Sequence, residues 1–492
     1  MNLLLKVLYI LTELKKLLGG INMEVAGSYG ILALLPIFLA LVLAFWTKNS
    51  VFSILMGCIL GVVIAGFNPA TGLTELFQSA LGSSWFIWVL MIEIFIGIMI
   101  ASFQRAGVIQ TFAKKASSKI GSRRGSTGFA WFLGVFCFFS DYFSPLFSGP
   151  IARPLTDENN VSREKLSYIL DSTSAPVPTL IPLSGWAVYI AGLLVDHGPI
   201  SNTSGAMSAF VRSIPYNFYA WLAIILAALL AFEIIPDFGP MKKAEKRAHN
   251  EGKLIRDGGT PMTGKELDDV KPPEGKLGNL TVFLFIPVAI IVTISLGTFF
   301  ILNDTKILTA FISAVIYLMI ALGIGGFFKD VNDAMDVAQD GIKGVLPAIL
   351  ILSLAFCINE ITQVLGGADY IISVTESWMT PAVLPALSFV AAGIMAFLTG
   401  TSWGTYGILF PFVMPIAFSL SGGVLAPVVF ASIAAVTGGG AFGDHCSPVS
   451  DTTILSSLGA GSDHIDHVTT QIPYALTAGV ISVILFVVIG IM

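Results

Sequence analysis

The feature that most constrains this chain is a series of apolar runs long enough to cross a lipid bilayer. A spanning helix needs about 20 predominantly apolar residues. We place spans at residues 28–46, 50–66, 84–104, 217–237, 279–300, 305–327, 345–365 and 472–491, with two more complicated regions at 127–195 and 383–457. The runs are continuous rather than alternating, which argues against a β-barrel. The sequence therefore predicts an all-α polytopic membrane protein.

Composition excludes several other classes of protein. Only 12% of the residues are charged, compared with about 25% in soluble domains. No basic stripe suggests nucleic acid as a partner. The four cysteines lie in apolar surroundings without CxxC spacing, so neither a disulfide framework nor a zinc site is indicated.

Residues 1–20 combine apolar residues at helical spacing with Lys6, Glu13, Lys15 and Lys16. Here the charges follow the apolar part, which is not the order of a signal peptide. We expect an amphipathic helix at the membrane surface, and a short first span is the alternative.

The remaining chain reads as two related halves, 28–238 and 278–492, separated by a charged linker at 239–277. Gly107 pairs with Gly367 and Pro150 with Pro411, at an offset of about 260 residues, as internal duplication requires. The match drifts to about 272 residues where DSTSAPV (171–177) pairs with GDHCSPV (443–449). We expect the linker to be a solvent loop on the cytoplasmic side.

The distribution of basic residues predicts that the two halves have inverted topology. Six Lys and Arg residues follow the third span of the first half, between 105 and 124, whereas the matching segment 366–381 has none. Basic loops mark the cytoplasmic side, so the two segments should lie on opposite sides. An even number of crossings then requires re-entrant hairpins at 127–152 and 383–421. Broken helices are expected at 163–195 and 423–457, with about five spans in each half.

Polar residues gather where these hairpins and broken helices would meet. The richest stretch is TGGGAFGDHCSPVSDTTILSS (437–457), and residues this polar at membrane depth are costly and usually functional. Secondary transporters bind ions and substrates at such broken helices near the midplane. The expected ion- or substrate-binding residues are Ser140, Asp141, Asp171, Ser172, Thr173, Thr401, Ser402, Asp444, His445, Ser447, Asp451 and Thr452. Among them, Asp141, Asp444 and Asp451 are the predicted Na⁺ ligands.

Several of these residues also have purely structural interpretations. Asp451 could cap the following half-helix, Asp171 could form a structural pair near the interface, and His445 could be a hydrogen-bonded packing residue. Glu93 and Glu360 are carboxylates in the matching third spans, for which we predict a proton-linked role. His464, Asp466 and His467 are expected to form a solvated turn.

Two segments resemble the NhaC-type sodium/proton antiporter family. They are GDHCSPVSDTTILSSLGAG (443–461) and RPLTDENNVSREKLSYILDSTSAPV (153–177). The resemblance covers most of the chain and implies a secondary transporter of the prokaryotic plasma (inner) membrane with Na⁺ as a transported or coupling ion. The wider group includes sodium-linked malate/lactate exchangers. Family members often carry two adjacent acidic residues before the tyrosine of the first hairpin tip, whereas Ser140-Asp141-Tyr142 has one.

The predicted function is Na⁺/H⁺ antiport by alternating access at midplane carboxylates. The alternative is a Na⁺-coupled carrier of a small organic anion, such as malate or lactate, or of an amino acid. An intramembrane hydrolase built on Asp444 fits poorly, because the glycine spacing differs from GxGD, and no enzyme activity is predicted. The expected partners are Na⁺, protons, the lipid bilayer and, in the alternative, an organic solute. No cofactor is expected, and a homodimer is compatible with the sequence.

Overall fold

A computed structural model describes residues 29–47, 49–117, 120–138, 141–182, 184–195, 197–263, 270–302, 306–367, 370, 373–374 and 382–491. Within them the chain is almost entirely helical, and its β-structure is limited to two isolated bridges. Seven helices in the described part are long and apolar enough to cross a membrane, or up to ten if each bent helix pair counts as one span. The prediction of an all-α polytopic membrane protein is confirmed. The predicted N-terminal helix at 1–20 lies outside the described residues.

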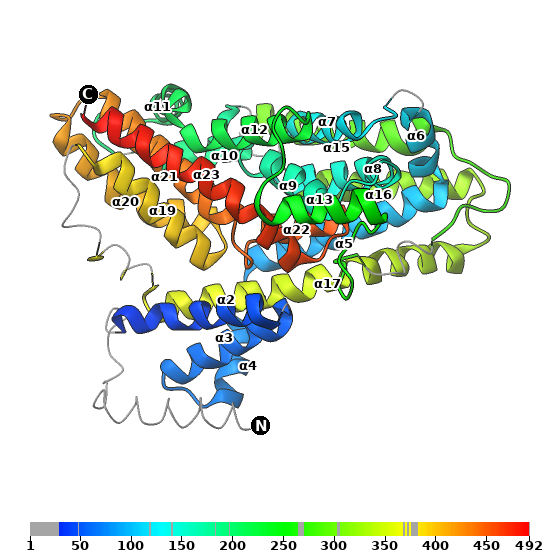
Figure 1. The fold of residues 1–492 in the computed structure, drawn as a ribbon, viewed down its shortest axis with the longest axis horizontal. Helices are drawn as coiled ribbons and strands as arrows, with labels where there is room; N and C mark the ends of the chain where they lie inside the picture. Colours follow the sequence, from blue (N-terminus) through cyan, green and yellow to red (C-terminus); the bar gives the residue numbers. More distant parts are fainter. Residues whose placement is uncertain are drawn as a thin grey trace.

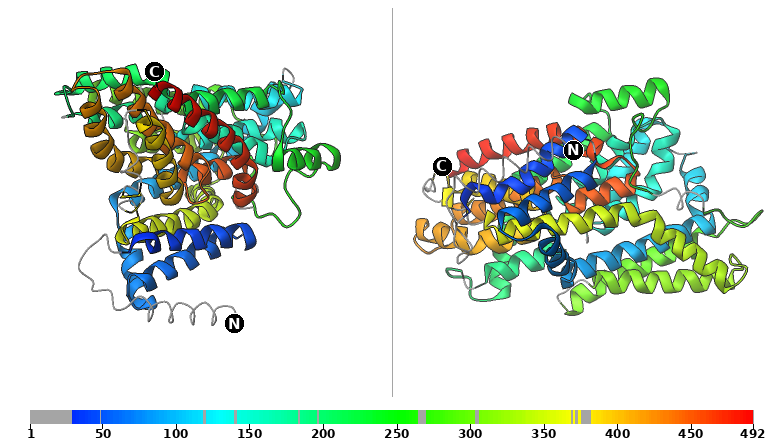
Figure 2. Two further views of the ribbon diagram at one scale, coloured as in Figure 1. Left: turned by 60° about the vertical axis from the view of Figure 1, so that its left-hand side comes forward. Right: turned by 90° about the horizontal axis from the view of Figure 1, so that it is seen from below.

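The first helices form a group beside the long helix α17 (Val331–Val364). They are η1 (Gly30–Leu34), α2 (Leu35–Thr47), α3 (Ser50–Ile64) and α4 (Pro69–Leu81). The chain bends by 110° between α3 and α4, because Asn68 and Pro69 begin a new helix there. Figures 1 and 2 show this group packed along α17, and it also touches α5 and α23. Helix α4 was not among the predicted elements.

The next helices place the first candidate polar region. After α5 (Ser84–Ala106) and α6 (Val108–Ser117), helices α7 (Arg123–Phe136) and α8 (Phe143–Glu158) pack together as a hairpin. Helix α9 (Arg163–Ser174) then ends in a proline-rich break containing η2 (Pro178–Leu180), and α10 (Gly185–Leu194) continues at an angle of 47°. Proline lacks a backbone N–H and its ring clashes with the preceding turn, which ends α9. The half closes with α11 (Thr203–Ser213), η3 (Ile214–Tyr216) and α12 (Phe218–Ala231).

The second half contains a similar series of elements. It begins with the π-helical turn η4 (Thr281–Phe285), α15 (Ile286–Leu302), α16 (Ile307–Ile324) and α17. Helix α17 is 34 residues long and begins at Val331, well before the predicted 345–365 span. It continues through Pro347. A second hairpin follows in α19 (Leu384–Thr399) and α20 (Ser402–Leu420). A second interrupted helix consists of α21 (Pro427–His445) and α22 (Asp451–Ala460), before α23 (His464–Ile491).

The linker is not simply the solvent loop that the sequence predicted. Residues 239–251 form helix α13 (Gly239–Glu251), which buries Met241, Ala244 and Ala248 and packs against α9 and α23. The following segment pairs Pro261 with Asp463 in an isolated antiparallel bridge. The charge content suggested a loop, but the lysines of α13 are exposed, whereas Met241, Ala244, Ala248 and the ion-paired Glu245 lie on its buried face.

Ion pairs hold the linker to the ends of the membrane helices. Arg247 donates to both carboxylate oxygens of Glu164, at 2.9 and 2.8 Å. Arg256 pairs with Asp466 at 2.7 Å, and Glu245 accepts from Arg123. Glu164 is only 3% exposed, so this pair is shielded from the solvent that weakens surface salt bridges.

We expect the Arg247→Ala substitution to destabilise the protein by about 2 kcal/mol, because a buried carboxylate loses its partner. The measurement is the midpoint of thermal unfolding in detergent. Lys242→Ala is the matched control, since Lys242 is an exposed cation on the same helix, and should leave the midpoint unchanged. Equal midpoints for both variants would show that the ion pair contributes nothing.

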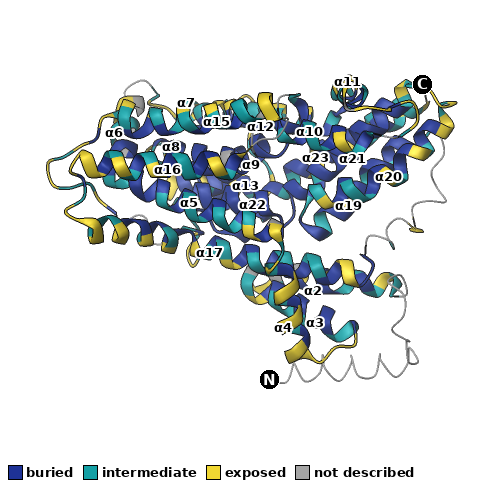
Figure 3. Ribbon diagram, turned by 180° about the vertical axis from the view of Figure 1, so that it is seen from behind, coloured by how far each residue is buried: buried dark blue, intermediate teal, exposed yellow. Residues whose placement is uncertain are grey.

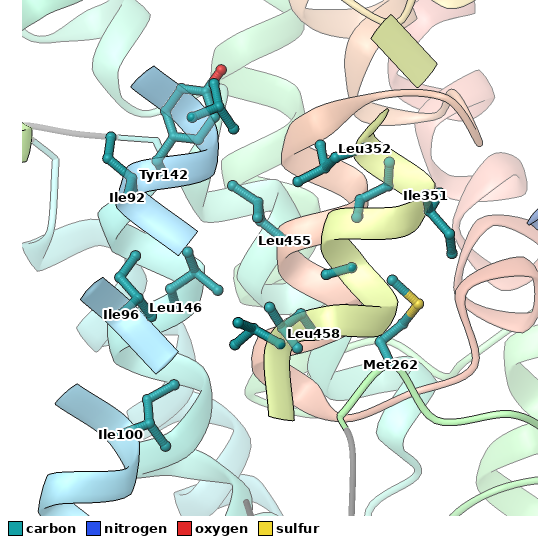
Figure 4. Packing of buried hydrophobic residues seen from close by; sticks show 14 of the residues in the cluster. Ile92, Ile96, Ile100, Tyr142, Leu146, Met262, Ile351, Leu352, Leu455 and Leu458 are labelled. Carbon is teal, nitrogen blue, oxygen red and sulfur yellow. The ribbon is translucent and has the colours of Figure 1, made fainter. Parts of the chain in front are cut away.

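The helix interfaces around the two breaks are buried and closely packed. In Figure 3 the buried residues gather on α9, α21 and α22. Close approach depends on small residues, as expected for helix packing in membranes. A Cβ on Gly443 would lie 2.1 Å from the carbonyl oxygen of Gly393, and one on Gly459 would lie 2.3 Å from that of Pro145. Figure 4 shows the apolar cluster shared by α5, α8, α17 and α22, including Ile96, Leu146, Leu352, Leu455 and Leu458.

Candidate functional site

The two interrupted helices contact each other at their breaks. Helix α9 packs against α22 and α23, and the Ser172 hydroxyl is 3.0 Å from Nε2 of His445, the last residue of α21. The other nitrogen of His445, Nδ1, is 2.7 Å from the Tyr219 hydroxyl. His445 is therefore held from both sides by α9 and α12, which fits the packing interpretation of this residue.

Asp444 connects the second break to the tip of the second hairpin. Its Oδ2 accepts a 2.5 Å hydrogen bond from the hydroxyl of Ser402, the first residue of α20. Its Oδ1 is buried and has no hydrogen-bond partner among the described residues. A buried polar atom without a partner costs free energy and calls for an explanation. A cation or a proton at Oδ1 would supply that missing partner.

Asp451 connects the second break to the tip of the first hairpin. The Tyr142 hydroxyl donates to Oδ2 of Asp451 at 2.6 Å. The neighbouring Asp141 accepts at Oδ2 from the Trp186 indole N–H at 2.8 Å, and at Oδ1 from the Tyr142 amide at 3.1 Å. Asp451 also stands in the first turn of α22, although Ser450 makes the N-cap hydrogen bond, and a carboxylate there is favoured by the helix dipole.

The three carboxylates Asp141, Asp444 and Asp451 share two properties. All are buried, with 4, 1 and 7% of their surface exposed. Among the residues that the structure describes, none forms an ion pair with Lys, Arg or His. A buried carboxylate without a basic partner is expensive when ionised. Each therefore favours either a bound proton or a bound cation.

A cavity of about 470 Å³ reaches this region. Asp451 and Thr401 are the predicted site residues that line it, with Thr399 and the aromatic side chains of Tyr189 and Trp403 beside them. The cavity lies between α17, the tip of the α19–α20 hairpin and the start of α22. It provides solvent-sized space next to one of the three carboxylates.

Asp171 has a different environment from the other aspartates. Its Oδ1 accepts from the Ser456 hydroxyl at 3.3 Å, and its Oδ2 accepts from Nε2 of Gln471 at 2.7 Å. Gln471 also donates to the backbone carbonyl of His445. Both oxygens of Asp171 thus accept from side chains of the second interrupted helix and of α23.

The remaining predicted hydroxyls bind mainly to the backbone. Thr173 donates to the Ile169 carbonyl at 2.8 Å. Its side chain lies against Gly134, so a Cβ on that glycine would clash with Thr173. Ser447 donates to the Phe397 carbonyl at 2.6 Å. Thr452 is 3.1 Å from the Ser450 hydroxyl, and Ser140 lies outside the described residues.

Glu93 and Glu360 lie in quite different surroundings. Glu93 is fully buried in α5, and neither of its oxygens has a hydrogen-bond partner among the described residues. Glu360 in α17 accepts from the Ser79 hydroxyl at 2.5 Å. The two residues match in sequence position, but only Glu93 is enclosed.

Sequence reasoning missed several residues that shape this region. Trp186, Tyr219 and Gln471 each hold a predicted site residue by a hydrogen bond. Gln471 gave the clearest available signal, since it is an uncharged amide just before a long apolar run. The expectation of a solvated turn at His464, Asp466 and His467 is wrong. All three are buried, because α13 and the linker cover the start of α23.

No group of three or more His, Cys, Asp and Glu side chains close enough to hold a metal ion occurs among the described residues. A Na⁺ ion would therefore need hydroxyl or carbonyl oxygens in addition to carboxylates. Both kinds of oxygen occur at the breaks, where helix ends leave carbonyl groups without intrahelical partners.

The apolar helices, the interrupted helix pairs and the buried carboxylates define a multi-pass membrane protein of the transporter class. The model of the Na⁺/H⁺ antiporter family matches residues 199–491, which is more than half of the chain. The chain belongs to this family, and the resemblance to NhaC-type antiporters is confirmed. Membership points to a secondary antiporter rather than an enzyme.

The chain is also similar to individual proteins, two of which are named as antiporters. An uncharacterized protein of Haemophilus influenzae is 33% identical and covers 94% of this chain and 91% of its own length. The malate-2H⁺/Na⁺-lactate antiporter of Bacillus subtilis is 33% identical over 38% of each chain. The Na⁺/H⁺ antiporter NhaC of Alkalihalophilus pseudofirmus is 29% identical over 36% of this chain and 38% of its own.

Proposed function

We propose that this protein exchanges Na⁺ for protons across the prokaryotic plasma membrane, using Asp141, Asp444 and Asp451. The observation that carries the proposal is the buried Oδ1 of Asp444, which has no partner among the described residues. The companion carboxylate Asp451 opens on the 470 Å³ cavity. An ionised carboxylate in this position attracts Na⁺, and a neutral one holds a proton. The same oxygens therefore serve both ions in turn.

The exchange follows from competition for these oxygens. When Na⁺ binds, its positive charge favours the ionised form, so a proton leaves the carboxylate. When a proton returns, the neutral acid loses its attraction for Na⁺, and the metal ion departs. In each step one ion binds to the carboxylates as the other leaves, so Na⁺ and the proton cross the membrane in opposite directions.

We propose that the two halves are inverted repeats that alternate access to this site. The α7–α8 hairpin corresponds to α19–α20, and interrupted helix α9–α10 corresponds to α21–α22. Discontinuous helices at a repeat interface are the arrangement in which secondary transporters bind their ions. The chemistry is less symmetric than the scaffold. Asp141 comes from the first hairpin and Asp444 and Asp451 from the second break, while the second hairpin contributes the Ser402 hydroxyl.

Reconstitution into liposomes tests the proposal directly. Vesicles containing the protein and an internal pH dye should show proton movement when NaCl is added outside, and none when KCl is added. Malate, lactate and amino acids are tested beside Na⁺. Proton movement that requires one of these solutes would replace the proposed exchange by solute-coupled transport, and no response to Na⁺ from acidic to alkaline pH would reject it.

The Tyr142→Phe substitution tests the contact between the first hairpin and Asp451. Losing the hydroxyl donor makes ionised Asp451 less stable, so protons compete better with Na⁺. We expect the Na⁺ concentration for half-maximal exchange to rise about tenfold at neutral pH, which is the effect of one charge-assisted hydrogen bond. The difference should shrink at alkaline pH, where protons are scarce.

Tyr317→Phe is the matched control for this measurement. Tyr317 of α16 donates to the backbone carbonyl of Val282 in η4, at 3.3 Å. Helix α16 contributes no carboxylate to the proposed site. Its substitution should leave the Na⁺ dependence unchanged. A Tyr142→Phe variant with the same Na⁺ dependence as this control would remove Tyr142 from the proposed mechanism.

A further inference from the structure

Two buried histidines face a single hydroxyl group at the start of α23. Nδ1 of His464 is 3.0 Å from the Ser457 oxygen, and Nδ1 of His467 is 2.8 Å from the same oxygen. Ser457 belongs to α22 and is fully buried, while His464 and His467 are 2 and 0% exposed. Neither the proposed exchange nor the helix packing accounts for this arrangement.

The other nitrogen of each ring shows where its proton lies. Nε2 of His464 is 2.8 Å from the Pro448 carbonyl oxygen, which only accepts, so Nε2 carries a proton. Nε2 of His467 is 2.7 Å from Oε1 of Gln471. The Gln471 amide nitrogen donates to Asp171 at 2.7 Å, so the oxygen Oε1 is the end of the amide that faces His467 and accepts from it. Each neutral imidazole therefore has a bare Nδ1 directed at Ser457.

This leaves more acceptors than hydrogens. The hydroxyl of Ser457 has one hydrogen, but three acceptors surround it, namely the two Nδ1 atoms and the Thr453 carbonyl oxygen at 2.9 Å. With both rings neutral, at least one buried Nδ1 has no donor, which is unfavourable. If one ring took up a second proton, its Nδ1–H group would donate to the Ser457 oxygen. The hydroxyl of Ser457 would then donate its own hydrogen to Nδ1 of the other ring. The cluster thus has a place for one additional proton.

We propose that His464, Ser457 and His467 form a proton-binding site that holds one proton between the two imidazoles. The site is separate from Asp141, Asp444 and Asp451 and goes beyond the exchange proposed for them. Its added proton turns one imidazole into an imidazolium, with Nδ1–H donating to Ser457. No other bond is formed or broken.

Asp171 on α9 is placed to balance the added charge. Its Oδ2 lies 3.8 Å from Nε2 of His467, and both side chains are fully buried. The other ionisable groups around the cluster are His445 at the end of α21, Asp463 and Asp466 near the start of α23, and Arg163 and Arg256. Arg256 pairs with Asp463 and Asp466, while Arg163 pairs with Asp157 and donates to the carbonyls that end α22. Asp171 is therefore the carboxylate that faces His467 without a basic partner of its own.

A crevice gives the cluster a connection to the linker side of the protein. It has a volume of about 160 Å³ and is lined by His464 and Asp463 together with Asn49, Thr260 and Met262. Asn49 and Thr260 are exposed. The proton site therefore lies between the linker and the first interrupted helix. From the linker side its groups follow in the order crevice, His464, Ser457, His467 and Asp171.

Nitrogen NMR of ring-labelled histidine tests the proposal. The chain has five histidines, and His197→Gln with His249→Gln leaves His445, His464 and His467. The protein is grown with ¹⁵N-ring histidine, placed in lipid bilayers without Na⁺ at about pH 7.5, and measured by magic-angle spinning. We expect one doubly protonated ring among the three. Three neutral rings would overturn the proposal, and this outcome needs no variant of the cluster itself.

Single substitutions locate the proton. His464→Gln and His467→Gln should each abolish the imidazolium signal, because the remaining Nδ1 then receives the Ser457 hydrogen. His445→Gln should retain it. A signal that disappears only with His445→Gln would overturn the assignment, and elution as a sharp peak in size-exclusion chromatography verifies that each variant is folded.

The NMR readout is independent of transport. An imidazolium in a protein that moves no protons in response to Na⁺ would support the histidine site and reject the proposed exchange. Na⁺-driven proton exchange in a protein with three neutral rings would support the proposed exchange and reject the histidine site.

Discussion

Replacing Asp444 with asparagine is expected to abolish Na⁺-driven proton movement in liposomes, reducing its rate at least about 100-fold. Asparagine keeps the shape of the side chain and an oxygen for the 2.5 Å hydrogen bond from Ser402. It cannot ionise, so it can neither release a proton nor offer a negative charge to Na⁺. The loss should be the same at all Na⁺ concentrations, because the exchanging group itself is missing.

Asp340→Asn is the control for the Asp444 variant. Asp340 lies on α17, where its partly exposed carboxylate pairs with Lys343 at 3.0 Å. The same chemical change there should leave exchange at the wild-type rate. An Asp444→Asn protein that is folded and retains more than half of the wild-type rate would exclude Asp444 as the exchanging carboxylate.

Gly443→Ala is expected to lower the stability of the protein by about 1–3 kcal/mol, the usual cost of overpacking. The new Cβ would lie 2.1 Å from the Gly393 carbonyl oxygen and 2.6 Å from the Phe397 nitrogen. Both are backbone atoms that cannot rotate away, so α19 and α21 must separate. Because Gly443 precedes Asp444, the shift should also displace the Asp444 carboxylate from Ser402. Thermal unfolding in detergent and transport in liposomes measure the two effects.

Gly297→Ala separates this clash from the general effect of alanine. Nothing lies within 4 Å of a Cβ at Gly297 in α15, and alanine favours a helix more than glycine does. This variant should unfold at the same temperature as the wild type or slightly above it. If Gly443→Ala behaved in the same way, the close approach of α19 and α21 would not contribute to stability.

Membrane helices and their breaks could be read from the sequence because their causes are local. An apolar run of spanning length has few alternatives to a helix in lipid. Prolines such as Pro178 end a helix wherever the rest of the chain lies. The bend before α4 and the linker helix α13 were missed. Both depend on short amphipathic segments whose apolar faces have meaning only against a neighbouring helix.

The candidate site was partly accessible to the same reasoning. Asp444 and Asp451 stood out because carboxylates in apolar surroundings are expensive. Ser402 was also predicted, but its bond to Asp444 was not, and neither was the bond from Tyr142 to Asp451, which spans 309 positions of sequence. The cluster of His464 and His467 was interpreted as solvated because a short polar stretch looks the same whether or not another segment covers it.

The sequence by itself determined that this chain is a helical membrane protein with polar breaks, because hydrophobic length and proline chemistry act within a few residues. Tertiary structure alone decided which polar groups found partners. Asp171 is satisfied by Ser456 and Gln471, whereas one oxygen of Asp444 is left without a donor among the described residues. That difference arises from helices that are distant in sequence, whose packing sets which donors come within hydrogen-bond range.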